Sequence, residues 1–270
     1  IMSEDSANVH EPKFFCANPN VIEGLKKASF NVLSVANNHI MENEDALFWN
    51  TVQLLKNNNI YPVGIANEIE IICVKGYKIA FLAYSFIEDN IPNSGYNKIH
   101  SEEPILQDIQ KIRSGVDLII VSIHWGYEYV PYPSPEQIRI GRKLVDGGAD
   151  IILGGHPHVT QSYEIYKNRP IFYSLGNFIF DHTYIPATRE SFIAEITISD
   201  TQEQISVSVI PFMADENSYQ PRVASSPHAE LSIKSIDIIR STFENRPLSY
   251  YIESIRDYDL LSRRYRKPAR

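Results

Sequence analysis

Hydrophobic and polar residues alternate along the chain with two different periods. Short apolar runs rich in β-branched residues predict strands, and apolar positions three or four residues apart predict helices. The predicted strands span residues 31–36, 60–65, 69–74, 77–84, 117–123 and 150–154. The predicted helices span residues 20–28, 44–57, 102–113 and 135–147. This order is typical of a parallel or mixed sheet that is covered by helices.

The pattern changes after residue 160. Short strands separated by turn signals are predicted at 162–166, 170–174, 190–198 and 203–211. They predict a mainly antiparallel second sheet packed on the first, followed by helices at 229–245 and 249–265. A polar loop at about 88–101 either covers part of the protein or lies in solvent. We expect one large domain over residues 1–225 and a helical extension over residues 226–270.

Three of the predicted strands end in side chains that can bind a metal. These ends are Gly155-His156-Pro157-His158 after 150–154, His124 after 117–123, and Asn37-Asn38-His39 after 31–36. Sites in open α/β sheets form beyond the carboxyl ends of the strands, so these residues are candidate ligands of a common site. Because a residue before proline avoids helical geometry, we expect His156 to His158 to run extended, with both imidazoles on one face.

Composition narrows the class of protein. With 43% hydrophobic and 21% charged residues, the chain of 270 residues has the make-up of a globular protein. Its formal net charge of −8 argues against a nucleic-acid-binding surface. Cys16 and Cys73 form either one bridge or two free thiols. The sequence contains no apolar run of about 18 residues, the length that predicts a membrane-spanning helix, and no recognisable signal peptide.

An aromatic run follows His124. Together with Pro131, Pro133 and Pro135, the four rings of Trp125, Tyr127, Tyr129 and Tyr132 form either a groove for an extended polymer or a rigid loop packed on its own rings. Packed loops are the more common structure for such a run, so we favour that interpretation.

These motifs resemble those of a known family. Asn37-Asn38-His39, His124-Trp125-Gly126 with Glu128, Gly155-His156-Pro157-His158, and the segment 173–178 with Asp181 follow the order found in CapA-type capsule (poly-γ-glutamate) synthesis proteins. Those proteins are similar to the calcineurin-like metallophosphoesterases, whose Gly-Asn-His and Gly-His-x-His signatures hold a two-metal site. The resemblance spans about residues 14–225. It implies an α/β fold, a four-layer α-β-β-α sandwich of two mixed sheets.

The resemblance also implies two divalent ions, of manganese, zinc or iron. Asn38, His124 and His156 would bind one ion and His158 the other. The remaining ligands would come from a Gly-Asp and an Asn-Leu-Glu motif that this sequence does not contain, so we expect the chain to lack the first part of the domain. The family usually has an Asp and a Gly after Asn-Asn-His. This chain has Glu42-Asn43-Glu44 there, which leaves the role of that acid open.

Other residues are assigned roles beside the metals. His39 resembles the phosphoesterase histidine that is not a ligand and that protonates a leaving oxygen or stabilises charge. Glu128 is interpreted as an acid, a substrate contact or a residue that orients a histidine, and a solvated loop glutamate is the alternative. Asn37, Asn177 and Asp181 would support the ligands, although Asn177 beside a glycine also suits a simple turn.

These residues predict a metal-dependent, phosphoesterase-like hydrolase that acts in capsule or other cell-surface polymer biosynthesis. A non-catalytic assembly or export subunit of a capsule machine is the alternative, and hydrolysis or transfer at polyglutamate γ-amide bonds is a weaker one. The expected partners are an anionic polymer or a phosphoester, and a capsule synthesis complex at the membrane. By resemblance, the full-length protein would lie at the cell envelope outside the cytoplasm, with a cytoplasmic location as the alternative.

Overall fold

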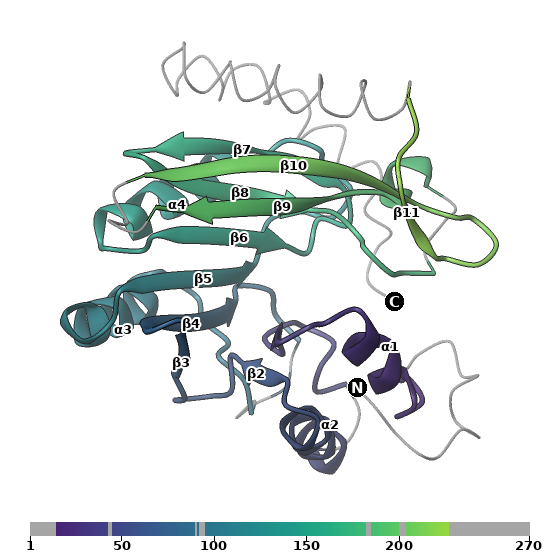
Figure 1. The fold of residues 1–270 in the computed structure, drawn as a ribbon, viewed down its shortest axis with the longest axis horizontal. Coiled ribbons are helices and arrows are strands. Elements are labelled where there is room, and N and C mark those ends of the chain that lie inside the picture. The colour runs from purple at the N-terminus through teal and green to yellow at the C-terminus, as the bar shows by residue number, and fades with distance from the viewer. Residues whose placement is uncertain are drawn as a thin grey trace. The chain divides into compact units, whose positions relative to one another are not determined.

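The computed structural model describes residues 15–42, 45–89, 91, 95–181, 185–199 and 204–226 (Figure 1). The chain forms two compact units, unit 1 up to His124 and unit 2 from Trp125 onward. Both cysteines are free thiols, which settles the question that the sequence left open. In these residue ranges, no helix is both long and apolar enough to cross a membrane.

Unit 1 contains the elements predicted for its residues. They are helices α1 (Val21–Lys27), α2 (Asp45–Asn57) and α3 (Glu103–Ile112), the 3-10 turn η2 (Arg113–Gly115), and strands β1 (Val32–Ser34), β2 (Tyr61–Val63), β3 (Glu70–Val74), β4 (Tyr77–Ser85) and β5 (Leu118–His124). β1 and β2 pair in parallel and are shorter than predicted. β3 and β4 form an antiparallel hairpin, and β4 pairs in parallel with β5.

The apolar core of unit 1 surrounds α2. Phe48, Val52 and Leu55 are spaced three or four residues apart and are all buried. They belong to one cluster with Val63 of β2 and Ala83 of β4. The helix was predicted from Leu47, Thr51, Leu54 and Leu55, of which only Thr51 and Leu55 lie on the buried face.

A buried carboxylate holds the loop after β4. The Asp89 side chain is 1% exposed and accepts hydrogen bonds from the Tyr96 hydroxyl at 2.6 Å and from Lys98 Nζ at 2.6 Å. Burial alone would raise the pKa of Asp89. Hydrogen bonds from Lys98, Tyr96 and the backbone of Ile91 outweigh burial and hold the pKa below its usual range. The described part of the predicted polar loop is therefore packed on the unit rather than free in solvent.

The prediction that the strands at 162–166 and 170–174 belong to the second sheet is wrong, because both lie in one sheet with the strand predicted at 150–154. Among the predicted strands, only 190–198 and 203–211 form the second sheet. Unit 2 therefore contains strands of two sheets. Its elements are α4 (Pro135–Asp146), the 3-10 turn η3 (Pro186–Arg189), and strands β6 (Ile151–Gly155), β7 (Thr160–Tyr166), β8 (Arg169–Leu175), β9 (Glu190–Ile198), β10 (Ile205–Ala214) and β11 (Pro221–Val223). β8 lies between β6, its parallel partner, and β7, its antiparallel partner. β9 and β10 pair antiparallel, and β11 is an unpredicted strand at the edge of β10. The helices predicted at 229–245 and 249–265 lie outside the described residues, so the helical extension stays a prediction.

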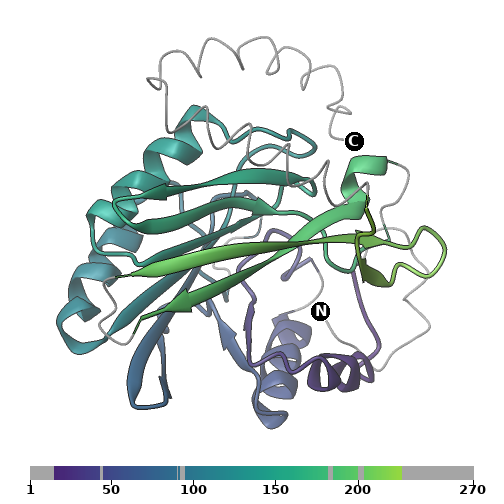
Figure 2. The ribbon, with the colours of Figure 1, turned by 45° about the horizontal axis from the view of Figure 1, so that its top comes forward.

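Adjacent residues of β8 face opposite layers of unit 2. Phe172 packs against Tyr163 of its own sheet and Phe192 of β9, with ring centroids 5.1 and 6.0 Å away. Ile171 faces α4, where a Cβ built at Gly141 would lie 3.0 Å from its Cγ2 atom. Because side chains alternate along a strand, β8 joins a helix layer to a second sheet. Figure 2 shows the green β9 and β10 lying across the teal strands.

A buried tryptophan side chain packs on β6 at Gly154. Trp125 is 2% exposed, its ring stacks on Tyr173 with centroids 6.1 Å apart, and its indole N–H donates to the Tyr173 carbonyl oxygen at 2.9 Å. A Cβ at Gly154 would lie 2.1 Å from that oxygen and 2.6 Å from the indole nitrogen. A Cβ at Gly155 would meet nothing within 4 Å. The first glycine before the histidines therefore makes room for this bond, and the second does not.

The two glycines allow a matched test. We expect Gly154→Ala to lower the free energy of unfolding by about 1–3 kcal/mol, because the tryptophan and the β8 backbone must move apart. Gly155→Ala is the control and should change this free energy by less than about 0.5 kcal/mol. Urea unfolding followed by tryptophan fluorescence measures both values. Equal stability of the two variants would contradict the packing described for Trp125.

The pKa of Asp89 predicts how stability depends on pH. A carboxyl whose pKa is lower in the folded state stabilises fully above its unfolded pKa of about 3.9, and this contribution is lost as the pH falls through the folded pKa. We expect Asp89→Asn to lower the free energy of unfolding by about 2–4 kcal/mol at neutral pH. The difference in melting temperature from the parent protein should shrink below about pH 4. Glu88→Gln, which alters an exposed pair with His100, is the control and should have little effect at neutral pH. A difference in melting temperature between Asp89→Asn and the parent protein that stays constant down to pH 2 would contradict the stabilising role of the Asp89–Lys98 ion pair.

Candidate functional site

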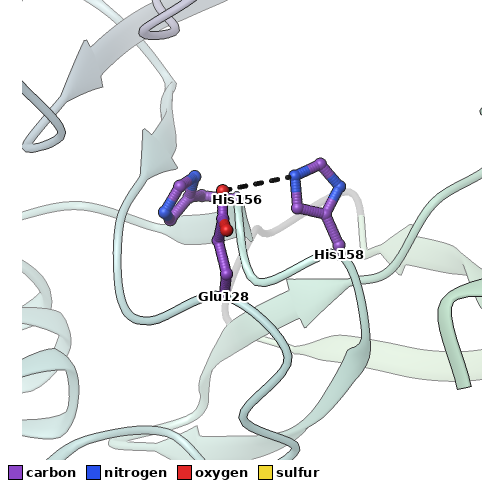
Figure 3. Close-up of side chains that lie close together, drawn as sticks. All are labelled: Glu128, His156 and His158. Atoms are coloured by element: carbon purple, nitrogen blue, oxygen red, sulfur yellow. Dashed lines mark ion pairs between the residues drawn. The ribbon is translucent and has the colours of Figure 1, made fainter. Parts of the chain in front are cut away.

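Three side chains of unit 2 form a cluster with metal-binding chemistry. One ligand atom each from Glu128, His156 and His158 lies within 4.8 Å of the others (Figure 3). Glu128 lies in the loop before α4, and the two histidines follow β6. His158 Nε2 lies 4.0 Å from Glu128 Oε1. Ligands at about 2.0–2.2 Å from one ion lie a little closer together than this, so small side-chain rotations would let the cluster close on a cation.

Asn177 sets the orientation of His158. Its Oδ1 atom lies 3.0 Å from His158 Nδ1, while its Nδ2 group donates to the carbonyl oxygen of Thr188 at 3.1 Å. Because the Nδ2 bond fixes which end of the amide faces the ring, His158 Nδ1 must carry the proton. The lone pair of His158 is then on Nε2, the atom that approaches Glu128. The geometry agrees with the supporting role expected of Asn177.

Aromatic rings lie on both sides of His158. Tyr129 stacks on it with centroids 5.9 Å apart and planes at 25°, and Phe180 packs at 5.0 Å with planes at 47°. Burial, followed by the negative charge of Glu128, raises the pKa of Tyr129 to about 12. These contacts restrict rotation of the imidazole, so the direction of Nε2 is set before any ligand binds.

The predicted extended conformation of the two histidines is wrong. His156 has φ +98° and His158 has φ +61°, both in the left-handed region. The proline disfavours right-handed helical geometry at His156, but it does not exclude a positive φ, and the chain turns at the end of β6. The backbone N–H of Tyr129 donates to the Pro157 carbonyl oxygen at 2.8 Å, which holds the turn. Two non-glycine residues at positive φ are a strained arrangement of the kind that collects at functional sites.

The candidate residues of unit 1 form a second group. Asn38 Oδ1 lies 2.9 Å from His124 Nε2, so two predicted ligands far apart in sequence are neighbours. The side chain of Asn37 accepts a hydrogen bond from the backbone N–H of His39 at 2.9 Å and thereby shapes the turn. Asn38 Nδ2 lies 3.4 Å from His39 Nε2. The turn at Asn37, the candidate ligands Asn38 and His124, and His39 therefore lie close together in unit 1.

Glu42 is the partner of His39. Its Oε1 atom lies 2.6 Å from His39 Nδ1, and both side chains are about a third exposed, at 28% and 31%. Phe15 packs on the imidazole with ring centroids 4.4 Å apart. The carboxylate and the ring together hold the Nδ1 side of His39, while Nε2 faces Asn38 Nδ2 at 3.4 Å. The acid whose role the sequence left open therefore belongs to this site.

Sequence reasoning missed several residues of the two groups. It also assigned a supporting role to Asp181, which lies outside the cluster of Glu128, His156 and His158. The missed residues contact the candidate histidines but belong to no sequence motif; they are Tyr129, Phe180 and Glu42. For Glu42 a signal existed, because it stands three residues after His39, where a side-chain contact is possible. Asp181 is exposed and is not among the described residues that form the metal-type cluster. The aromatic run does not pack on its own rings as expected: Trp125 is buried against Tyr173, Tyr129 stacks on His158, and Tyr127 is 45% exposed.

The comparisons with known proteins agree with these motifs. The family model of the bacterial capsule synthesis protein PGA_cap matches residues 2–182. The capsule biosynthesis protein CapA of Bacillus anthracis is 32% identical over 228 residues, which are 79% of this chain and 54% of that protein. The PGA biosynthesis protein CapA of Bacillus subtilis is 31% identical over 193 residues, 66% of this chain and 50% of that protein. The chain thus spans about half the length of these curated relatives.

A solved structure shares the fold. A novel phosphatase from Mycoplasma pneumoniae superposes with a TM-score of 0.52 at 14% sequence identity, and the match covers 73% of this chain and 77% of that one. The α/β fold class expected from the metallophosphoesterase resemblance is confirmed. With two thirds of its residues matched by the family model, the chain belongs to the bacterial capsule synthesis protein family PGA_cap.

Proposed function

We propose that the chain acts in capsule or cell-surface polymer biosynthesis as a metal-dependent hydrolase of phosphoesters. One observation carries the proposal: Glu128, His156 and His158 converge, with His158 held through Nδ1 by Asn177 and its Nε2 turned toward Glu128. Two nitrogens and a carboxylate suit manganese, zinc or iron. The capsule family supplies the biological setting at the cell envelope.

The proposed ligands of one ion are Glu128, His156 and His158. The sequence left Glu128 as an acid, a substrate contact or a residue that orients a histidine. The spacing of the cluster supports a different role for it, that of a metal ligand. A divalent ion held there would supply positive charge that polarises a phosphoryl oxygen and activates a water molecule. The wider ligand set implied by the family resemblance, in which Asn38 and His124 bind an ion together with His156, remains part of the proposal.

His39 is the proposed general acid. As water attacks phosphorus and the ester P–O bond breaks, His39 Nε2 gives its proton to the leaving oxygen. Glu42, bound to Nδ1 at 2.6 Å, holds the ring in place for the transfer. Asn37 supports this geometry because its side chain binds the backbone N–H of His39.

The alternative is an assembly or export subunit whose metal site has no catalytic role. The names of the two Bacillus relatives state biosynthesis and no reaction, which suits either interpretation. A net charge of −8 disfavours binding of a polyanion by the protein surface alone. Phosphoesters are therefore the preferred substrates to test, with γ-glutamyl amides beside them.

The ligand assignment predicts metal content. We expect Glu128→Ala, His156→Ala and His158→Ala each to weaken manganese or zinc binding at least about tenfold while the fold is kept, because the residues lie on loops beyond the strands. His100→Ala is the control, since its side chain is 76% exposed and lies outside the cluster. Elemental analysis after dialysis, with circular dichroism for the fold, makes the measurement. Unchanged metal in all three variants would rule out the site.

The acid assignment predicts a loss of turnover without loss of metal. We expect His39→Gln to reduce hydrolysis of a generic phosphoester about 10²- to 10⁴-fold, because the leaving oxygen loses its proton donor. Glu42→Gln should cause a smaller loss, since the acid remains but is less well held, and His100→Gln serves as the control. Steady-state kinetics on metal-loaded protein gives both values. Metal-loaded parent protein without turnover on phosphoesters would favour the assembly subunit instead.

A further inference from the structure

The loop that carries Glu128 is held by a buried glutamine. We call residues 126–134 the Glu128 loop. Gln161, on β7, is 1% exposed, and its Nε2 group donates to the carbonyl oxygens of Val130 at 2.8 Å and Tyr132 at 3.0 Å. Both hydrogens of that amide group are thus used on the backbone of the Glu128 loop, two and four residues beyond the carboxylate.

A second buried glutamine completes the chain of hydrogen bonds. Gln137, on α4, is 3% exposed, and its Nε2 group donates to Gln161 Oε1 at 3.0 Å. Its Oε1 atom accepts from the backbone N–H of Ser134 at 2.9 Å, in the capping box that starts α4. The amide oxygen of each glutamine therefore has a defined donor, and the end of the loop is tied to the same network as its middle.

The start of the Glu128 loop depends on the same network. Gly126 has φ +87°, and a Cβ there would lie 2.8 Å from the side-chain amide of Gln137. In between, the backbone N–H of Tyr129 donates to the carbonyl oxygen of Pro157, which separates the two histidines. The Glu128 loop is therefore fixed at its beginning, middle and end. Gln161, on the strand that follows the histidine turn, connects this loop to that turn.

We propose that Gln161 is a positioning residue of the metal centre: it holds the Glu128 loop so that the Glu128 carboxylate meets His156 and His158. This inference rests on the proposed metal site. Gln161 acts through Glu128 and touches no ligand itself. Without it, two carbonyl oxygens of the loop and the amide of Gln137 lose their buried partners, and the loop must move to reach water. Metal affinity then falls because the carboxylate is no longer preorganised.

The test is a double-mutant cycle on metal affinity in the full chain. Gln161→Leu keeps roughly the volume of the side chain and removes its hydrogen bonds. We expect it to weaken Mn²⁺ binding about 10- to 100-fold, the range seen when groups that orient ligands are removed. Because Gln161 acts through Glu128, Gln161→Leu should cost little further affinity in a Glu128→Ala background. Isothermal titration of chelator-treated protein with Mn²⁺ gives the dissociation constants of the parent protein, the two single variants and the double variant.

Two further variants separate positioning from general stability. Phe192→Leu destabilises unit 2 at its sheet interface, away from the Glu128 loop, and should leave Mn²⁺ affinity unchanged. Gln161→Glu keeps the acceptor for Gln137 but removes the amide donor, so it serves if Gln161→Leu does not fold, and it should also weaken binding.

Native Mn²⁺ affinity in a folded Gln161 variant, or fully additive losses in the cycle, would overturn the inference while the metal site stands. Absence of Mn²⁺ binding in the parent protein would instead overturn the proposed function, and the positioning role with it.

Discussion

The hydrogen bond from the Trp125 indole to the Tyr173 carbonyl oxygen is the contact on which the architecture of unit 2 depends. It passes over Gly154, so β6 must present a glycine where every other residue would collide. The tryptophan that makes the bond stands directly before the Glu128 loop, and Gly154 stands two residues before His156. One buried polar contact therefore ties together the loop and the turn that supply the candidate ligands.

Buried polar groups elsewhere in unit 2 are satisfied in the same way. Glu164, of which 5% of the side chain is exposed, receives the guanidinium fork of Arg142 and the hydroxyl of Tyr173 at 2.6 Å. The hydrogen bonds with Glu164 raise the pKa of Arg142. A buried charge is tolerated only when paired and bonded, so these contacts fix α4 against the sheet in one register. The buried side chains of Gln161 and Gln137 are also hydrogen-bonded, and their partners include the backbone of the Glu128 loop.

The two units orient their histidines by the same chemistry. In unit 2 an amide oxygen of Asn177 accepts from His158 Nδ1, and in unit 1 a carboxylate oxygen of Glu42 binds His39 Nδ1. His158 Nε2 approaches Glu128, whereas His39 Nε2 faces Asn38 Nδ2 at 3.4 Å. The partners of the two Nδ1 atoms differ in charge, because one is an amide and the other a carboxylate.

The sequence by itself predicted the helices and most strands of the described residues through apolar spacing. It also named Asn38, His124, His156 and His158 as candidate metal ligands, because they follow apolar strands. Local patterns sufficed there, since burial of a strand or a helix face imposes its period on neighbouring residues. The left-handed backbone at both histidines, the contact between Glu42 and His39, and the hold of Gln161 on the Glu128 loop were decided only by the tertiary structure. Gln161 lies 31 residues beyond Val130 in the chain, and no local period encodes such a contact. Its identity is dictated by two buried carbonyl oxygens that need a donor, a requirement that arises only once the loop and the strand have packed.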